Sequence, residues 1–296
     1  MRLLEYTVLV MGIIVCVSAG LNDVVPDKEC FGTNNGLSYS QSYIRHYRSM
    51  KRRYKECTHI NGNLEITHLA NNDYNYDMSF LNNIRYVTGY VLIALNTGVN
   101  VLRFPSLQII RGNNTMRLRG KEYSLAVALN YKSNYPKLGL IELHFPQLKE
   151  ISGGDILFTQ NPRLCYIDTI NWQAISGRGS DSIDAPGTDP VSPFNRKCAE
   201  CPVECKVNGR SRCWGNDENL CQRAPPNVCH SSCPYRCYGP GPEGCCHGNC
   251  AGGCWGPKST ECMLCKDYRL WNRCVESCPL EYDHLNQMCY IQNILS

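Results

Sequence analysis

The sequence lacks three features by which common functional classes of protein are recognised. After residue 21 it has no run of about 18 apolar residues, so no membrane span is expected in the mature chain. Its 30 basic side chains are nearly balanced by 26 acidic ones, so nucleic acid is not expected as a partner. It also lacks Gly-x-Ser-x-Gly, His-Glu-x-x-His and the kinase glycine-rich and catalytic loops. We therefore expect a protein that is not an enzyme and that needs no cofactor.

Cysteine is abundant instead, and the N-terminus indicates which compartment the cysteines enter. Arg2 precedes an apolar run over residues 6–17, and the small residues Ser18 and Ala19 follow, as in a secretory signal peptide. We expect residues 1–20 to be removed and the mature chain to be secreted and extracellular. Of the 21 cysteines only Cys16 lies in this segment, and the 20 that remain are an even number in a compartment where thiols pair.

The cysteines divide the chain into two domains. Only Cys57 lies between Cys30 and Cys165, whereas residues 198–289 hold 17 cysteines. Residues 176–197 are rich in Ser, Gly, Asp and Pro without an apolar period, which predicts a loop or linker. We therefore predict a first domain over residues 21–175, a cysteine-rich domain over 198–289 and a C-terminal tail over 290–296.

Short apolar segments recur along the first domain. Residues 63–66, 90–95, 107–110 and 125–129 have the composition of strands. The pattern Phe-Pro-x-Leu-x-x-Ile at 104–110 recurs at 145–151. Irregular repeats with one short strand each predict a solenoid, in which stacked coils share one hydrophobic interior.

The segment 43–55 places apolar residues at helical spacing among six basic side chains. This pattern predicts an amphipathic helix with a solvated basic face. A heparin-like binding site is the less favoured alternative.

The cysteine-rich domain contains a tandem repeat. A block with the spacing Cys-x3-Cys-x3-Cys-x7-Cys over residues 229–245 is followed at once by the same block over 246–262. Because few aliphatic residues lie between these cysteines, disulfides worth roughly 2–4 kcal/mol each must replace a conventional core. The Cys-x2-Cys pairs at 198–201 and 262–265 have the spacing of zinc knuckles or redox dithiols, but the secreted context favours disulfides, and no metal site is expected.

Several of these segments carry a family resemblance. Gly-Asn-Leu-Glu-Ile-Thr at 62–67, Gly-Tyr-Val-Leu-Ile-Ala-Leu-Asn at 89–96, Cys-Trp-Gly at 213–215 and Cys-Cys-His at 245–247 together resemble the epidermal growth factor receptor family. The resemblance covers residues 30–282 and implies a mainly β fold. That fold is a right-handed β-solenoid L domain, followed by an elongated, disulfide-stapled furin-like cysteine-rich domain. In the family, the tryptophan that matches Trp214 resembles a plug at the end of the solenoid.

The resemblance also implies a disulfide pattern. Carried over position by position, it joins the mature cysteines as Cys30–Cys57, Cys165–Cys198, Cys201–Cys213, Cys205–Cys221, Cys229–Cys237, Cys233–Cys245, Cys246–Cys254, Cys250–Cys262 and Cys265–Cys274. Cys278 and Cys289 are left for one another, although the sequence around Cys289 departs from the family pattern.

The family further implies a protein ligand that resembles epidermal growth factor and adds a strand to the edge of the first L-domain sheet. The matching positions are Leu37, Ser38, Tyr39, Ser40, His68, Leu95, Ala128 and Leu129. Three of them, at 39, 40 and 68, differ in type from the family, and residues 71–75 include an insertion beside this face. The identity of the ligand therefore does not carry over.

The segment after Cys278 also departs from the family, in which a long hairpin arm between the matching cysteines pairs two receptors. Only ten residues, 279–288, separate Cys278 from Cys289 here, so we expect a monomer. The function expected is growth-factor binding by a secreted, truncated receptor or decoy. The alternatives are the ligand-binding start of a receptor tyrosine kinase and a structural or adhesive protein that reuses the scaffold. The sequon at residues 113–115 predicts a glycan on Asn113.

Overall fold

The structure, a computed structural model, describes residues 28–132, 134–135, 138–176, 183–184, 198–223, 229–234, 236–285 and 287–291. The predicted signal peptide and residues 292–296 of the predicted tail lie outside these ranges. No helix among the described residues is both long enough and apolar enough to cross a membrane.

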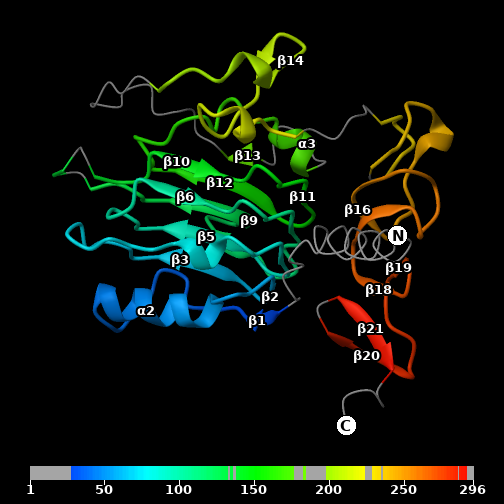
Figure 1. Cartoon of the computed structure of the whole chain (residues 1–296), viewed down its shortest axis with the longest axis horizontal. Coiled ribbons are helices and arrows are strands. Elements are labelled where there is room, and N and C mark those ends of the chain that lie inside the picture. Colours follow the sequence, from blue (N-terminus) through cyan, green and yellow to red (C-terminus); the bar gives the residue numbers. More distant parts are fainter. Residues whose placement is uncertain are drawn as a thin grey trace, which may run out of the picture.

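The first domain is a stack of coils with parallel strands on its sides (Figure 1). One sheet has the order β1-β2-β4-β7-β11, a second has β13-β12-β9-β5-β3, and β6 pairs with β10. The first sheet consists of β1 (Glu29–Phe31), β2 (His59–Asn61), β4 (Tyr86–Val87), β7 (Ile109–Ile110) and β11 (Glu150–Ile151). The second consists of β3 (Leu64–Thr67), β5 (Val91–Ala94), β9 (Lys121–Ala128), β12 (Asp155–Thr159) and β13 (Ile183–Asp184), with β8 (Met116–Leu118) paired antiparallel to β9. The remaining pair is β6 (Val101–Arg103) and β10 (Glu142–His144).

The register of the second sheet aligns apolar side chains from coil to coil. Leu64 pairs with Val91, and Val91 pairs with Leu125. Two residues further along each strand the same alignment recurs, because side chains in a strand alternate between the two faces. The inward residues of β3, β5, β9 and β12 join one buried core: Leu64, Ile66, Val91, Ile93, Leu125, Val127, Ile156 and Phe158. The predicted β-solenoid is confirmed, with strands near each predicted segment.

Two local features differ from the sequence prediction. The segment 107–110 contributes only the two-residue strand β7, because Leu107 lies in the preceding turn, where its amide donates to Phe104 O. Within residues 176–197, predicted as a loop or linker, Ile183 and Asp184 form β13 beside β12. Ile183 packs against the core, and Asp184 accepts a hydrogen bond of 2.8 Å from the Tyr123 hydroxyl, which explains why this short strand docks.

Both ends of the stack are closed by aromatic side chains. At one end lies α2 (Tyr43–Tyr54), whose N-cap Ser42 accepts from the Arg45 amide and whose inner face buries Tyr47, Met50 and Tyr54. This confirms the predicted amphipathic helix. Further along the coils, Trp214 is 2% exposed and packs edge-on against Phe145 and against Trp172, the first residue of α3 (Trp172–Ser176). The predicted packing role of Trp214 is confirmed.

The cysteine-rich domain starts near the last coil and descends along one side of the first domain (Figure 1). Its strands are β14 (Lys206–Val207), β15 (Arg210–Ser211), β16 (Cys250–Cys254), β17 (Cys262–Cys265), β18 (Tyr268–Leu270), β19 (Arg273–Val275), β20 (Tyr282–Leu285) and β21 (Met288–Ile291). Single 3-10 turns occur at η1 (Ser79–Leu81) in the first domain and at η3 (Val203–Cys205), η4 (Glu218–Leu220) and η5 (Pro242–Gly244) in the second. Ten disulfides join the same cysteines that the family resemblance pairs, Cys278–Cys289 included.

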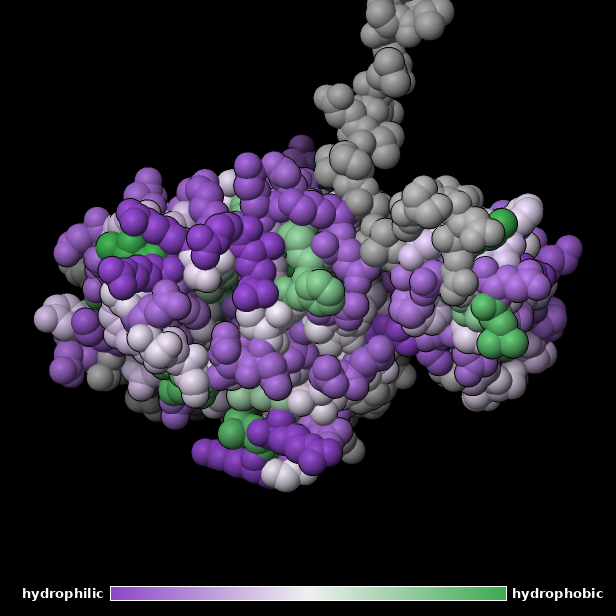
Figure 2. Space-filling view, turned by 90° about the horizontal axis from the view of Figure 1, so that it is seen from below, coloured by the Kyte–Doolittle hydropathy of each residue, from purple (hydrophilic) through white to green (hydrophobic). Residues whose placement is uncertain are grey.

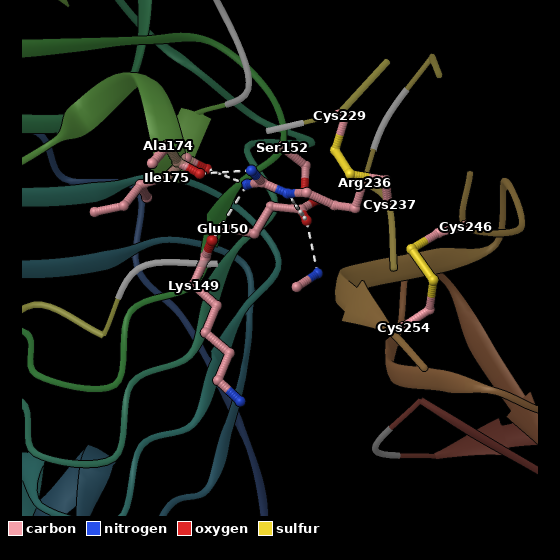
Figure 3. Close-up of polar contacts among 11 residues, drawn as sticks. Lys149, Glu150, Ser152, Ala174, Ile175, Cys229, Arg236, Cys237, Cys246 and Cys254 are labelled. Atoms are coloured by element: carbon pink, nitrogen blue, oxygen red, sulfur yellow. Dashed lines mark hydrogen bonds and ion pairs between the residues drawn. A yellow bond between two sulfur atoms is a disulfide. The ribbon is translucent and has the colours of Figure 1, made fainter. Parts of the chain in front are cut away.

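Arg236 fastens the cysteine-rich domain to the first domain (Figure 3). Its guanidinium donates to the carbonyl oxygens of Ala174, Ile175 and Lys149 and lies 3.4 Å from Glu150 Oε2. That carboxylate oxygen also accepts a 2.7 Å hydrogen bond from the Gly252 amide. One arginine and one glutamate thus link β11, α3 and the two cysteine blocks.

A second contact lies between the first sheet and the β16–β18 region. Arg111 forms an ion pair with Asp267, and both side chains are mostly buried, with 17% and 15% of their surface exposed. Beside this pair, Tyr86, Ile109, Ala251 and Leu264 form a small apolar cluster. Together with Trp214, which packs on Phe145 and Trp172, these contacts hold the cysteine-rich domain against the first domain in several separated regions.

Candidate functional site

Three of the positions predicted to contact a ligand come together in one column. His68, Leu95 and Leu129 follow β3, β5 and β9, and each has a φ of 59°. The His68 amide donates to Ala94 O at 3.2 Å and the Leu95 amide to Ala128 O at 3.3 Å, so successive members lie on neighbouring strands. Left-handed backbone disfavours side chains with a Cβ, so the surrounding structure must hold these residues in place.

An asparagine ladder supplies that constraint. Asn96 Oδ1 accepts from the Leu69 amide at 3.1 Å, and Asn130 Oδ1 accepts from the Asn96 amide at 3.0 Å. Asn161 continues the ladder by accepting from the Asn130 amide at 3.3 Å. The side-chain amides donate in turn to Ile66 O, Ile93 O and Val127 O. Sequence analysis missed this ladder. The tripeptide Ala-Leu-Asn occurs at both 94–96 and 128–130, and this repetition could have indicated it.

The segment 37–40 covers one end of this column. Leu37, Ser38, Tyr39 and Ser40 are all exposed, with Leu37 at 42% and Tyr39 at 40%. The Tyr39 ring packs on His68, with ring centroids 4.1 Å apart, and His68 is only 6% exposed. Ala128 is also buried, at 8%, two residues after Ala126 of the apolar cluster on the outer face of the second sheet. The members of the predicted set with accessible apolar or aromatic side chains are therefore Leu37, Tyr39, Leu95 and Leu129. The side chains of His68 and Ala128 are buried.

An open groove of about 390 Å³ lies between this segment, α2 and β3. β3 is the edge strand of the second sheet, so the predicted ligand positions lie on that sheet and not on the one described first above. We refer to it as the edge groove. Its lining includes Asn35, Tyr39, His46, Arg53 and Glu65. An exposed sheet edge beside a groove is the geometry by which an extended segment of a partner adds as a further strand.

Glu65 ties the segment before residue 37 to β3. Although it is 4% exposed, its carboxylate accepts two backbone hydrogen bonds of 2.8 Å, from Asn35 and Gly36, and one of 2.6 Å from the Tyr90 hydroxyl. Burial and this neighbouring carboxylate raise the pKa of Tyr90. A buried carboxylate with three donors is a satisfied structural anchor, so it positions the loop that borders the edge groove.

Two histidines adjoin Tyr39. The His46 and His68 rings meet edge to face, with centroids 5.9 Å apart, and His46 Nε2 lies 3.3 Å from Thr67 Oγ1. Burial lowers the pKa of both histidines, and the proximity of His46 lowers the pKa of His68 further. The neutral imidazoles are therefore the forms that fit this packing.

The cysteines of the two Cys-x2-Cys pairs, and three histidines of the cysteine-rich domain that could be read as metal ligands, have other partners. All four cysteines of the Cys-x2-Cys pairs lie in disulfides. The His230 ring bonds Ser232, the His247 ring accepts from the Asn249 amide, and His284 packs on Tyr268. No cluster of three or more metal-ligating side chains occurs within the ranges that the structure describes. Asn113, the predicted glycosylation site, lies exposed in a turn after β7.

Comparisons with known proteins match both domains. Residues 56–176 match the receptor L domain family, and residues 190–294 match the furin-like cysteine-rich region. The chain is 38% identical over 259 residues to the epidermal growth factor receptor of Drosophila melanogaster, covering 87% of this chain and 17% of that receptor. It is 38% identical over 272 residues to the Gallus gallus receptor of the same name, covering 92% of this chain and 36% of that protein.

A further relative is the human receptor tyrosine-protein kinase erbB-4, which is 41% identical over 201 residues, or 68% of this chain and 14% of that kinase. The chain thus spans about a third or less of the length of the curated relatives it matches. The order of the two domains, the ten disulfides and the similarity along most of the chain lead to one assignment: the chain belongs to the epidermal growth factor receptor family, as a part of its ectodomain.

Proposed function

We propose that the chain binds a protein ligand resembling epidermal growth factor, outside the cell, through the column of Leu95 and Leu129 and the adjoining edge groove. The observation that carries this proposal is the continuity of the surface. Tyr39 bridges from the groove onto His68, and the column continues from His68 across neighbouring strands. An extended ligand segment would pair with the edge of β3 and place apolar side chains beside Leu37 and Leu95.

The extracellular location is part of the same proposal. It is supported by the ten disulfides, which persist in oxidising compartments, and by the relatives that are named receptors. We propose that this chain by itself captures a growth factor without transmitting a signal, as a secreted decoy does.

We also propose that the chain is a monomer in solution. The hairpin closed by Cys278–Cys289 is short, and it is fastened to its own domain. β21 pairs with β18, and Gln287 donates a 3.0 Å hydrogen bond to Asp267 O. A hairpin held in this way leaves no long arm between the two cysteines to reach a second molecule. Sedimentation equilibrium with and without ligand tests this, and a ligand-dependent species of twice the chain mass would refute it.

The binding proposal is tested with a double variant, Leu37→Glu with Leu95→Glu. It should abolish surface plasmon resonance binding of epidermal-growth-factor-like proteins from the source species, because a charge would enter an apolar contact. The matched control is Val203→Glu with Leu280→Glu, which changes two exposed apolar residues of the cysteine-rich domain, at 70% and 102% exposure. Equal binding by both double variants would place the ligand elsewhere, and no binding by the unaltered chain would favour a structural or adhesive role.

A further inference from the structure

A row of basic side chains runs along the outer face of α2. Residues 43–55 contain six basic and no acidic side chains. Arg45, Arg48, Arg52 and Lys55 follow one another at helical spacings of three or four residues, and all four are exposed. At 1.5 Å per residue the row is about 15 Å long. It lies opposite the face that buries Tyr47, Met50 and Tyr54, so the core does not use it.

Most of this charge is not neutralised within the part of the chain that the structure describes. Lys51 pairs with Asp77 at 2.6 Å, and Lys55 lies 3.5 Å from Glu56. The arginines at 45, 48, 52 and 53 have no ion pair to another described residue. Like charges three or four positions apart destabilise a helix, and so does a cation in the first turn, where Arg45 lies. An anion along the row would remove both penalties.

The surroundings of the row indicate the kind of anion. Figure 2, which views the molecule from below, shows mainly hydrophilic side chains over much of the surface. A shallow hollow of about 340 Å³ adjoins the row and is lined by Arg52, Arg53, Ser49 and Phe31, which is 75% exposed. Membrane binding by an amphipathic helix needs a free apolar face, whereas the apolar face of α2 is buried in the core. An extended hydrophilic polyanion fits this surface better than a lipid bilayer does.

We propose that α2 binds a sulfated glycosaminoglycan, with the sulfate groups along Arg45, Arg48 and Arg52. A guanidinium presents a planar fork of donors that pairs with oxyanions through two hydrogen bonds. Phe31, at the side of the hollow, offers an apolar surface to a sugar ring. Arg53 lines both this hollow and the edge groove, but Arg45, Arg48 and Arg52 do not line the edge groove. The inference therefore does not depend on growth-factor binding.

The test is heparin binding by the disulfide-intact chain, measured by surface plasmon resonance at 0.15 M and 0.5 M salt. The triple variant Arg45→Gln, Arg48→Gln, Arg52→Gln keeps helix propensity, since glutamine and arginine are similar helix formers. It should bind heparin about tenfold or more weakly at 0.15 M salt, and the unaltered chain should lose most of its binding at 0.5 M. Desulfated heparin should bind neither protein.

A matched control removes the same charge elsewhere. Arg117→Gln, Arg119→Gln, Lys121→Gln changes three exposed basic residues of the β8–β9 hairpin and should retain heparin binding. Near-ultraviolet circular dichroism checks that both variants remain folded. The inference is overturned if the hairpin variant loses as much binding as the α2 variant, if desulfated heparin binds as tightly, or if anionic phosphatidylserine vesicles bind and heparin does not.

Discussion

Replacing Arg236 with alanine should loosen the junction between the two domains without unfolding either one. The side chains of Arg236 and Glu150 are 11% and 14% exposed, so the variant would leave a mostly buried carboxylate without its cation. The carbonyl oxygens of Ala174, Ile175 and Lys149 would also lose a donor. Removing one partner of a buried pair typically costs about 3 kcal/mol. Because every 1.4 kcal/mol is a factor of ten, local opening should become roughly 100-fold more frequent.

The Gly252 amide reports this opening directly, because it donates to Glu150 Oε2 at 2.7 Å. Native-state hydrogen exchange, followed by mass spectrometry, should show roughly 100-fold faster exchange of the peptide that contains Gly252. Amides in β5, far from the junction, should exchange as before. Arg236→Lys should be nearly as impaired, since a single ammonium cannot replace the fork of donors.

The control is Arg273→Ala, which removes an exposed arginine of β19. Exchange at Gly252 should be unchanged in this variant. If Arg236→Ala also leaves that exchange unchanged, the ion pair does not hold the junction near Gly252, and the remaining interdomain contacts, which include Arg111–Asp267 and Trp214, are sufficient.

Three further outcomes are expected. Asn130→Ala breaks three ladder contacts of a fully buried side chain and should lower the free energy of unfolding by about 2–4 kcal/mol. Thermal unfolding measures this loss. The control Asn114→Ala, at an exposed position, should have little effect. Burial lowers the pKa values of His46 and His68, so their contribution to stability is present above the unfolded pKa of about 6.5 and is lost as pH falls below it. The thermal midpoint of the parent protein should therefore drop between about pH 7.5 and 5.5. An equal drop in the variant with both histidines replaced by glutamine would contradict this. Asn113→Gln should reduce the mass of the protein secreted from animal cells by one N-glycan, and an unchanged mass would show that the sequon is not used.

Sequence reasoning reached the coil architecture because its signals are local. The strand composition of residues 63–66 and 90–95 and the repeat at 104–110 and 145–151 are patterns of neighbouring residues. The helix predicted over residues 43–55 follows from the spacing of apolar residues such as Ile44, Tyr47 and Met50 in the same way. The ten disulfide pairs, in contrast, came from the family resemblance, because spacing alone leaves many pairings open.

Burial and long-range partners were not accessible to the same reasoning. His68 and Leu95 were grouped with the ligand positions by resemblance. Only the fold shows that His68 packs against Tyr39 and that His68 and Leu95 lie in one column. β13 was missed because a two-residue strand carries no period, and what secures it is the hydrogen bond from Tyr123, 61 positions earlier.

The sequence by itself determined a chain of coils and cysteine-stapled blocks, since strand composition, the repeated motifs, helical spacing and the cysteine content can be read without any knowledge of long-range contacts. Only the tertiary structure decided how those units are joined. The Asn96–Asn130 ladder, the Glu65 anchor and the Arg236–Glu150 link each depend on groups 25 or more residues apart, with separations of 34, 25 and 86. Such contacts form only after the coils have stacked, because packing, rather than local preference, brings their donors and acceptors within hydrogen-bonding distance.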